Sequence, residues 1–425
     1  MPNRRSNSIR GGASSAALMG LLSVLFLFAS PLNAQKKKSA PAPDIKPGDQ
    51  RVTAYFDRSK IVWPNPPAIA RIKFLDLYTG EKIDRSKYEA KKKKQTWMDR
   101  LAGAQSTDQI KITSLPFQLI RTYGVAADSK GKVYAADQGV GGIFVFNPEN
   151  KDQVEVIGKD EHVHFQMLAG LAIDDNDRIF VTDLKARHVL VLNPKHEPEG
   201  VFGSDVLVRP GGVAIDKENR FAYVVDSGND VVDVFDADNY KLLRQIGKPS
   251  HKHESTDPGT FALPECVAVD DDGNVYVTDT FNNRIEIFDA DGNFISTFGK
   301  NGDAPNDLER PKGIAVDGDG HIWVIDAGTN QVKVFRKDGR LLIYFGGQGY
   351  YPGQFMGPWG IAIDKFNRVI VSETFPGRVQ LFRYVTDSEA ETETAERAKT
   401  EQKHTPNSAQ QASAAPATNK EVSPK

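Results

Sequence analysis

CVAVDDDGNVYVTDTFNNRIEIFDADGNFISTFG, residues 266–299, is one copy of a repeat that occurs six times between Gly124 and Phe382. In every copy an aspartate closes the first apolar run, and a second acid follows nine or ten residues later. The first acids are Asp128, Asp174, Asp216, Asp270, Asp317 and Asp364. The second acids are Asp137, Asp183, Asp226, Asp279, Asp326 and Glu373. A register kept over repeats of this length predicts an architecture built from one repeated unit.

Short runs of β-branched and aromatic residues surround these acids, such as VYVTD at 275–279 and IWVID at 322–326. Turn residues separate the runs, including Asp272-Gly273 and Asp338-Gly339, which are typical of hairpins between antiparallel strands. Each copy therefore predicts about four antiparallel strands. Six such units that must pack face to face predict an all-β fold, a six-bladed β-propeller.

The two ends of the repeat region predict how the ring closes. The sixth copy stops after its third strand, RVQLFRYV, so one outer strand is missing. Upstream, ARIKFLDL at Ala70–Leu77 alternates apolar and charged residues and forms a spare strand. We expect it to pair with Arg378–Tyr384 and to cover the open edge. The propeller then spans residues 63–385.

The outer segments predict export. Arginines precede an apolar run from Ala16 to Phe28, and Leu32-Asn33-Ala34 is a small-residue cleavage site, as in a secretory signal peptide over residues 1–34. Cleavage near Ala34 would place the protein in the periplasm or outside the cell; an uncleaved anchor is the alternative. Residues 35–62 and 386–425 are rich in Lys, Pro, Ala, Ser and Glu, which predicts a disordered linker and a disordered tail.

Charge and cysteine content narrow the function classes. The net charge is −2 and no broad basic footprint is present, which argues against a nucleic-acid partner. The one cysteine, Cys266, occupies the position that glycine holds in the other five copies. A small residue is expected there for packing near the axis, so a buried inert thiol is favoured over a catalytic nucleophile.

The pattern P-x-G-[IV]-A-[IV]-D, V-x-V-x-D and N-x-R-[IV]-x-[IV]-F resembles the NHL repeat, with Asn283, Arg284 and Phe288 in the fourth copy as the best match. WPNPPAIARIKFL at 63–75 is similar to the segment that leads into bacterial extracytoplasmic six-bladed NHL propellers. The resemblance implies the fold. It leaves function open among sensor domains, protein-binding scaffolds, RNA-binding modules, lyases and lactonases.

A ligand site is expected at the mouth of the central channel, where the innermost strands begin. The residues just before the six small-residue positions should ring this mouth: Tyr123, Ala169, Gly211, Glu265, Lys312 and Trp359. Two further candidates, Arg209 and Arg310, precede prolines at the same place. The aromatic rings could stack on a sugar or a peptide side chain, and the charged groups could pair with a ligand. Ordinary solvent-exposed rim residues are the alternative.

Metal binding is a weaker hypothesis. The ring of second acids, Asp137 to Glu373, could converge on a divalent cation such as calcium, although an acid present in every repeat also suits a structural hydrogen-bonding role. Glu373 is the deviant member. His162, His164, His251 and His253 lie in two loops, but no third ligand follows from their spacing.

A basic segment could reach a partner. Residues 87–104 combine Lys91–Lys94 with Trp97, Met98 and Leu101, which predicts a short surface helix that could contact anionic lipid. The sequence as a whole favours an exported scaffold that binds an envelope protein or a small-molecule or carbohydrate ligand at the mouth, with no cofactor and no catalytic residue assigned. A metal-assisted lyase or lactonase that uses acids of the funnel is the alternative. Ligand identity and oligomeric state stay open.

Overall fold

The computed structural model describes residues 57–80, 118–151, 153–159 and 163–404, with side chains up to residue 396. These residues belong to the second of two compact units, Ile45–Lys425. The predicted signal peptide and the basic segment with Lys91–Lys94 lie outside the described residues. Among the helices described, none is long and apolar enough to cross a bilayer.

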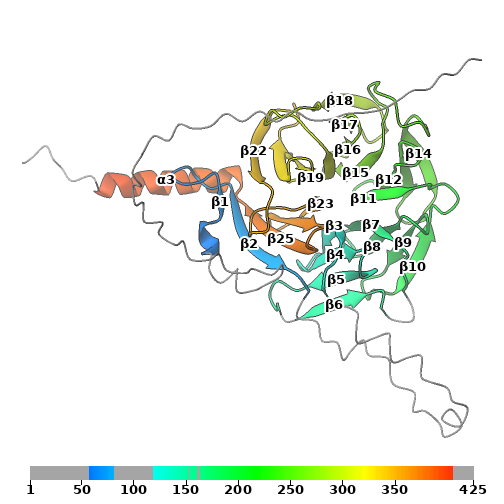
Figure 1. Ribbon diagram of the computed structural model, residues 1–425, viewed down its shortest axis with the longest axis horizontal. Coiled ribbons are helices and arrows are strands. Elements are labelled where there is room, and N and C mark those ends of the chain that lie inside the picture. Colours follow the sequence, from blue (N-terminus) through cyan, green and yellow to red (C-terminus); the bar gives the residue numbers. More distant parts are fainter. Residues whose placement is uncertain (1–56, 81–117, 152, 160–162, 405–425) are drawn as a thin grey trace, which may run out of the picture. The chain divides into compact units, whose positions relative to one another are not determined.

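Six antiparallel sheets follow one another around a ring (Figure 1), which confirms the six-bladed β-propeller. The innermost strands are β3 (Thr122–Ala127), β7 (Leu168–Ile173), β11 (Pro210–Asp216), β15 (Pro264–Val269), β19 (Pro311–Val316) and β23 (Pro358–Ile363). The second strands are β4 (Val133–Asp137), β8 (Ile179–Asp183), β12 (Phe221–Asp226), β16 (Val275–Asp279), β20 (Ile322–Asp326) and β24 (Arg368–Glu373). The third strands are β5 (Gly142–Phe146), β9 (His188–Leu192), β13 (Val231–Asp236), β17 (Arg284–Phe288), β21 (Gln331–Phe335) and β25 (Arg378–Tyr384). The outer strands are β6 (Val154–Ile157), β10 (Pro198–Phe202), β14 (Leu242–Gly247), β18 (Phe294–Phe298) and β22 (Leu341–Gly346).

The sixth blade takes its outer strand from the other end of the chain, as predicted. Strand β2 (Ile72–Tyr78) runs antiparallel to β25, with Phe74 opposite Phe382. Ile72 and Phe74 are buried, so the pairing joins the two ends of the repeat region through apolar contacts as well as hydrogen bonds. A two-residue strand, β1 (Val62–Trp63), extends this sheet to five strands and follows the short 3₁₀ helix η1 (Arg58–Lys60).

The tail departs from the prediction of disorder, because residues Asp387–His404 form helix α3. Thr386 and Glu389 make a capping box: the Glu389 amide donates to Thr386 Oγ1, and the Thr386 amide donates to a Glu389 carboxylate oxygen at 2.9 Å. Arg383 pairs with Glu389 at 2.6 Å, and Arg71 pairs with Asp387. Local capping and these ion pairs therefore order a segment whose composition alone predicts disorder.

At the five glycines among the small-residue positions, an added side chain would meet the neighbouring blade. A methyl group on Gly360 would lie 2.3 Å from the Tyr123 carbonyl oxygen, and one on Gly313 would lie 2.4 Å from the Trp359 carbonyl oxygen. The fourth blade has Cys266 at this position; it is buried, and burial raises the pKa of its thiol far above the usual value. The thiol is therefore held protonated, as expected for a packing residue.

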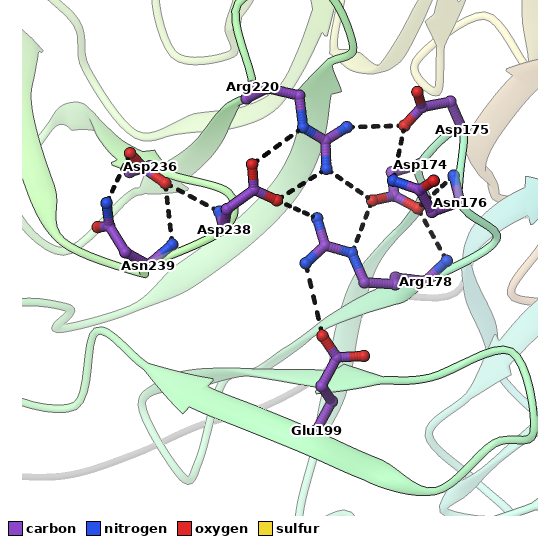
Figure 2. A network of polar contacts seen from close by, with 9 residues as sticks. All are labelled: Asp174, Asp175, Asn176, Arg178, Glu199, Arg220, Asp236, Asp238 and Asn239. Atoms are coloured by element: carbon purple, nitrogen blue, oxygen red, sulfur yellow. Dashed lines mark hydrogen bonds and ion pairs between the residues drawn. The ribbon is translucent and has the colours of Figure 1, made fainter.

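Apolar clusters fill the spaces between neighbouring blades, and polar networks add to them on one face. Figure 2 shows Arg178 and Arg220, which join the turns of the second and third blades. Arg178 is 9% exposed and donates to Asp174 and Asp238, at 2.8 Å each. Arg220 donates to Asp175 at 2.7 Å and also reaches Asp238. The shared carboxylates tie the two blades together.

Candidate functional site

The mouth of the channel is defined here by the leading ends of the six innermost strands and the turns between the second and third strands. Glu265 leads β15 and Lys312 leads β19, and their side chains form an ion pair between neighbouring blades. The Glu265 side chain is 24% exposed and the Lys312 side chain is 16% exposed. Two opposite charges are thus held at the mouth, partly shielded from water but still reachable.

An aromatic pair lies farther round the mouth, in the sixth blade next to the fifth and in the first blade opposite the fourth. Tyr123 in the first blade and Trp359 in the sixth contact edge to face, with ring centroids 5.0 Å apart. Burial raises the pKa of Tyr123; the charge of Arg121 opposes this rise and the charge of Glu265 adds to it. Since the first and fourth blades are opposite in a ring of six, Tyr123 and Glu265 lead innermost strands on opposite sides of the same mouth. Because its pKa is raised, the Tyr123 hydroxyl keeps its proton at neutral pH.

Ala169 and Gly211 bring at most a methyl group to the second and third blades' part of the mouth, and both are buried. Arg209 and Arg310 are exposed and stand beside the prolines that begin β11 and β19. Arg121 occupies the same place in the first blade but was not among the predicted site residues. Thr122 replaces the proline there, which hides the register; alignment on Gly124 would have revealed Arg121.

The second acids are engaged inside their own blades. Asp137 accepts the Ile120 and Arg121 amides at 2.7 and 2.9 Å, and it also accepts the amide of Val140 in the following turn at 2.8 Å. Asp326 accepts the Arg310 amide and the Lys333 ammonium, both at 2.8 Å. These carboxylates tie the loop that leads into each blade to that blade's second strand.

The hydrogen bonds that the second acids make within their own blades argue against a calcium ion shared by the ring of second acids. Glu373 is likewise buried and receives the Met356 amide at 2.8 Å and the Arg378 guanidinium at 2.6 Å. Burial raises the pKa of Glu373, and Arg378 opposes the rise. Within the described ranges, the six second acids do not come together in any group of ligand atoms close enough to share a cation. The geometry therefore supports a structural hydrogen-bonding role for the second acids.

The group of three that does come together among the described residues is Asp317, Asp319 and His321, in the turn between β19 and β20. The polar atoms of this group already make hydrogen bonds to one another and to neighbouring residues. Asp317 accepts His321 Nδ1 at 3.1 Å and Trp323 Nε1 at 2.8 Å, and the hydrogen bond from Asp317 raises the pKa of His321. Tyr384 lies 3.2 Å from His321 Nδ1. This group could hold a metal, but it lies at the trailing end of β19, away from the mouth.

The remaining histidines have separate partners. His253 lies 2.8 Å from Asp230, and His251 lies 3.2 Å from the Gly228 carbonyl oxygen. His164 is exposed, and His162 is outside the described residues. A zinc site shared by the two histidine loops is therefore not formed by the residues that the structure describes.

Comparisons with known proteins point to β-propellers. Residues 271–344 match the family model of the SMP-30/gluconolactonase/LRE-like region. The chain is 28% identical over 165 residues to a probable peptidyl-alpha-hydroxyglycine alpha-amidating lyase of Caenorhabditis elegans, a match that covers 36% of this chain and 46% of that protein. The chain thus spans about half the length of this curated relative. The similar proteins include lactonase- and lyase-type propellers.

One solved structure with a TM-score above 0.5 supports the fold, and others are more distantly similar. A Bacteroides thetaiotaomicron protein of unknown function superposes with a TM-score of 0.51 at 17% identity, over 62% of this chain and 70% of that one. Virginiamycin B lyase from Staphylococcus aureus gives a TM-score of 0.46 at 15% identity, over 62% of this chain and 95% of that one. A gluconolactonase from Xanthomonas campestris gives 0.48 at 17% identity, over 63% and 86%.

Proposed function

We propose that this propeller is an enzyme of the lyase or lactonase type that acts on a small organic molecule at the channel mouth. The observation that carries the proposal is the Glu265–Lys312 ion pair, which shares the mouth with the protonated hydroxyl of Tyr123. One side of the mouth thus offers a proton acceptor and a fixed positive charge. The other side offers a proton donor, and similarity to proteins named as lactonases and lyases supports the class.

Each side chain has a role that follows from its chemistry. Glu265 accepts a proton, either from a carbon next to a carbonyl group in an elimination or from a water molecule that attacks a lactone. Lys312 stabilises the negative charge that develops on the carbonyl oxygen. Tyr123 returns a proton to the departing oxygen, because its raised pKa keeps the hydroxyl protonated. Trp359 provides an apolar edge against which the substrate rests.

Members of the matched family are often metal-dependent. Of the acidic mouth residues described, Glu265 is paired with Lys312 and Asp230 with His253, while Glu309 is exposed; these carboxylates form no group close enough to share a cation. Divalent cations such as calcium take six or more oxygen ligands. This donor set does not fit such an ion, and no step of the proposal passes through a metal.

A binding function without turnover is the second candidate, and exposed apolar side chains on the same face favour it. Phe281 is 65% exposed, Phe375 is 58% exposed and Tyr350 is 58% exposed; the first two lie in turns between second and third strands, and Tyr350 lies in the loop that leads into the sixth blade. Such side chains suit a partner or a ligand with an apolar surface. With the leader predicted at residues 1–34, either function would operate outside the cytoplasm.

The experiment is steady-state kinetics of the full chain and of Glu265→Gln with sugar lactones and peptidyl-α-hydroxyglycines, the substrate types that the relatives' names suggest. Loss of the proton acceptor should lower kcat about 100-fold or more. Glu309→Gln, which removes an exposed acid from the same face, is the matched control and should keep kcat. Turnover that survives Glu265→Gln would overturn the proposed mechanism.

A further inference from the structure

Three arginines occupy one structural position in alternate blades. Arg121, Arg209 and Arg310 each precede the first residue of an innermost strand, in the first, third and fifth blades. The corresponding residues of the other blades are Met167, Leu263 and Gly357. In a ring of six blades, alternate blades are a third of a turn apart. The three arginine positions therefore surround the mouth from three sides.

Hydrogen bonds fix the three backbones in the same way. The amides of Arg121, Arg209 and Arg310 donate to Asp137, Asp226 and Asp326 at 2.9, 2.7 and 2.8 Å. The carbonyl oxygens of the same arginines accept the amides of Gln138, Ser227 and Ala327 at 2.9, 3.1 and 2.9 Å. The second acid of each of these blades thus positions an arginine at the mouth. The same backbone hydrogen bonds hold Met167 in the second blade, so the blade fixes this position and the arginines occupy it in alternate blades.

The side chains of the three arginines make no hydrogen bond or ion pair with the described residues of the protein. All three arginines are exposed, and within the described part of the chain no hydrogen bond or ion pair is recorded for their guanidinium groups. The half-buried Arg220 differs, because it pairs with Asp175 and Asp238. Among the described residues, the three mouth arginines are therefore open to contact by a ligand.

Cationic side chains are frequent at the mouth. Apart from the six buried second acids, which are engaged within their own blades, the leading residues of the innermost strands and the turns between second and third strands carry six cationic and three acidic residues. The cationic residues are Arg121, Lys185, Arg187, Arg209, Arg310 and Lys312. The acidic residues are Asp230, Glu265 and Glu309. Asp230 is buried against His253 and Glu265 is paired with Lys312, whereas the whole chain carries a net charge of −2.

We infer that the mouth binds a compact polyanion, a small molecule with two or more carboxylate or phosphate groups, which the three arginines hold over Glu265 and Lys312. Guanidinium groups suit this ligand because their planar donors match carboxylate and phosphate oxygens two at a time. Three cations spaced around one mouth favour a ligand with several negative charges over a ligand with one. The inference names the substrate class for the mouth and rests on the proposed function only in placing chemistry there.

The test is a calorimetric titration of the full chain with citrate, with tripolyphosphate and with acetate as the monovalent comparison. Citrate or tripolyphosphate should bind, and acetate should not do so measurably. Each of Arg121→Gln, Arg209→Gln and Arg310→Gln should weaken binding about 5-fold to 50-fold, since one charged hydrogen-bonding group is lost. The triple variant should abolish binding. Whichever polyanion binds more tightly identifies the carboxylate or the phosphate source.

Arg340→Gln is the matched control, because Arg340 is an exposed arginine in a turn at the other face of the fifth blade. It should leave binding unchanged, and added NaCl should weaken binding to the unaltered chain. A folded protein that binds neither polyanion, or a triple variant that binds as well as the unaltered chain, would overturn the inference.

Equal losses in Arg340→Gln would overturn it too, because they would show non-specific attraction. Failure of the proposed function is a separate outcome. It would appear as turnover that survives Glu265→Gln while the arginine-dependent binding persists.

Discussion

Gly360 shows at the scale of one residue how tightly the axis is packed. Its missing side chain faces the Tyr123 carbonyl oxygen, which closes the ring between the sixth and first blades. The Ser372 hydroxyl bridges the same strands: it accepts the Gly360 amide at 2.8 Å and donates to the Tyr123 carbonyl oxygen. Glycine is required at position 360 because the backbone of the first blade approaches it too closely for a side chain.

Gly360→Ala should destabilise the fold by about 1 to 3 kcal/mol, since a methyl group forces the two innermost strands apart. Gly318→Ala is the control, because a methyl group on Gly318 meets nothing within 4 Å. Chemical unfolding in urea measures both variants. Equal stabilities for the two variants would contradict the packing described for the axis.

Asp233 is a buried acid with one unpaired oxygen. Its Oδ1 accepts from Gln245 at 2.7 Å, while Oδ2 has no hydrogen-bond partner among the described residues. Burial raises the pKa of Asp233 from 3.8 to about 6, and Gln245 opposes the rise. Because the folded state holds this proton more tightly than the unfolded state, the group contributes most stability below pH 4, and this contribution is lost as the pH rises through 6.

Asp233→Asn should therefore raise the free energy of unfolding at pH 8 by on the order of 2 kcal/mol and change it little at pH 4. Unfolding curves at the two pH values give the measurement. Asp291→Asn, at an exposed carboxyl group, should show no such difference. A gain of the same size at both pH values would refute burial as the cause.

At the scale of elements, the role of strand β2 in closing the ring can be tested directly by mutation. Phe74 is 4% exposed and packs against Phe382 with ring centroids 5.6 Å apart, whereas the neighbouring Leu75 is 41% exposed. Phe74→Ala should cost about 3 to 5 kcal/mol, and Leu75→Ala in the same strand should cost far less. Thermal melts with limited proteolysis would report both; indifference to Phe74→Ala would mean that β2 does not close the ring.

Most elements could be predicted from the repeat, and the exceptions have physical reasons. Period-two alternation and Asp-Gly turns identify the blade strands, and the missing outer strand predicts the partner of β25. Strand β1 has two residues, too few to show a period. Helix α3 was not predicted because the composition of residues 386–425 is typical of disorder; the capping box of Thr386 and Glu389 is the local signal that indicates a helix.

At the scale of the whole molecule, the repeat register predicts which residues reach the mouth but not how they pair. Glu265 and Lys312 are 47 residues apart and meet because neighbouring innermost strands lie side by side. The second acids show the opposite case, since their ring in the sequence suggests a shared ion and the structure engages them blade by blade. Side-chain contacts between blades therefore cannot be predicted from the sequence of a single repeat.

The central claim is that chemistry takes place at the mouth, and its most direct test is a crystal structure of Glu265→Gln with a slowly turned-over substrate or its product bound. The account predicts ligand density enclosed by Tyr123, Lys312 and Trp359. Density at Asp317 and His321 on the other face, with an empty mouth, would contradict it.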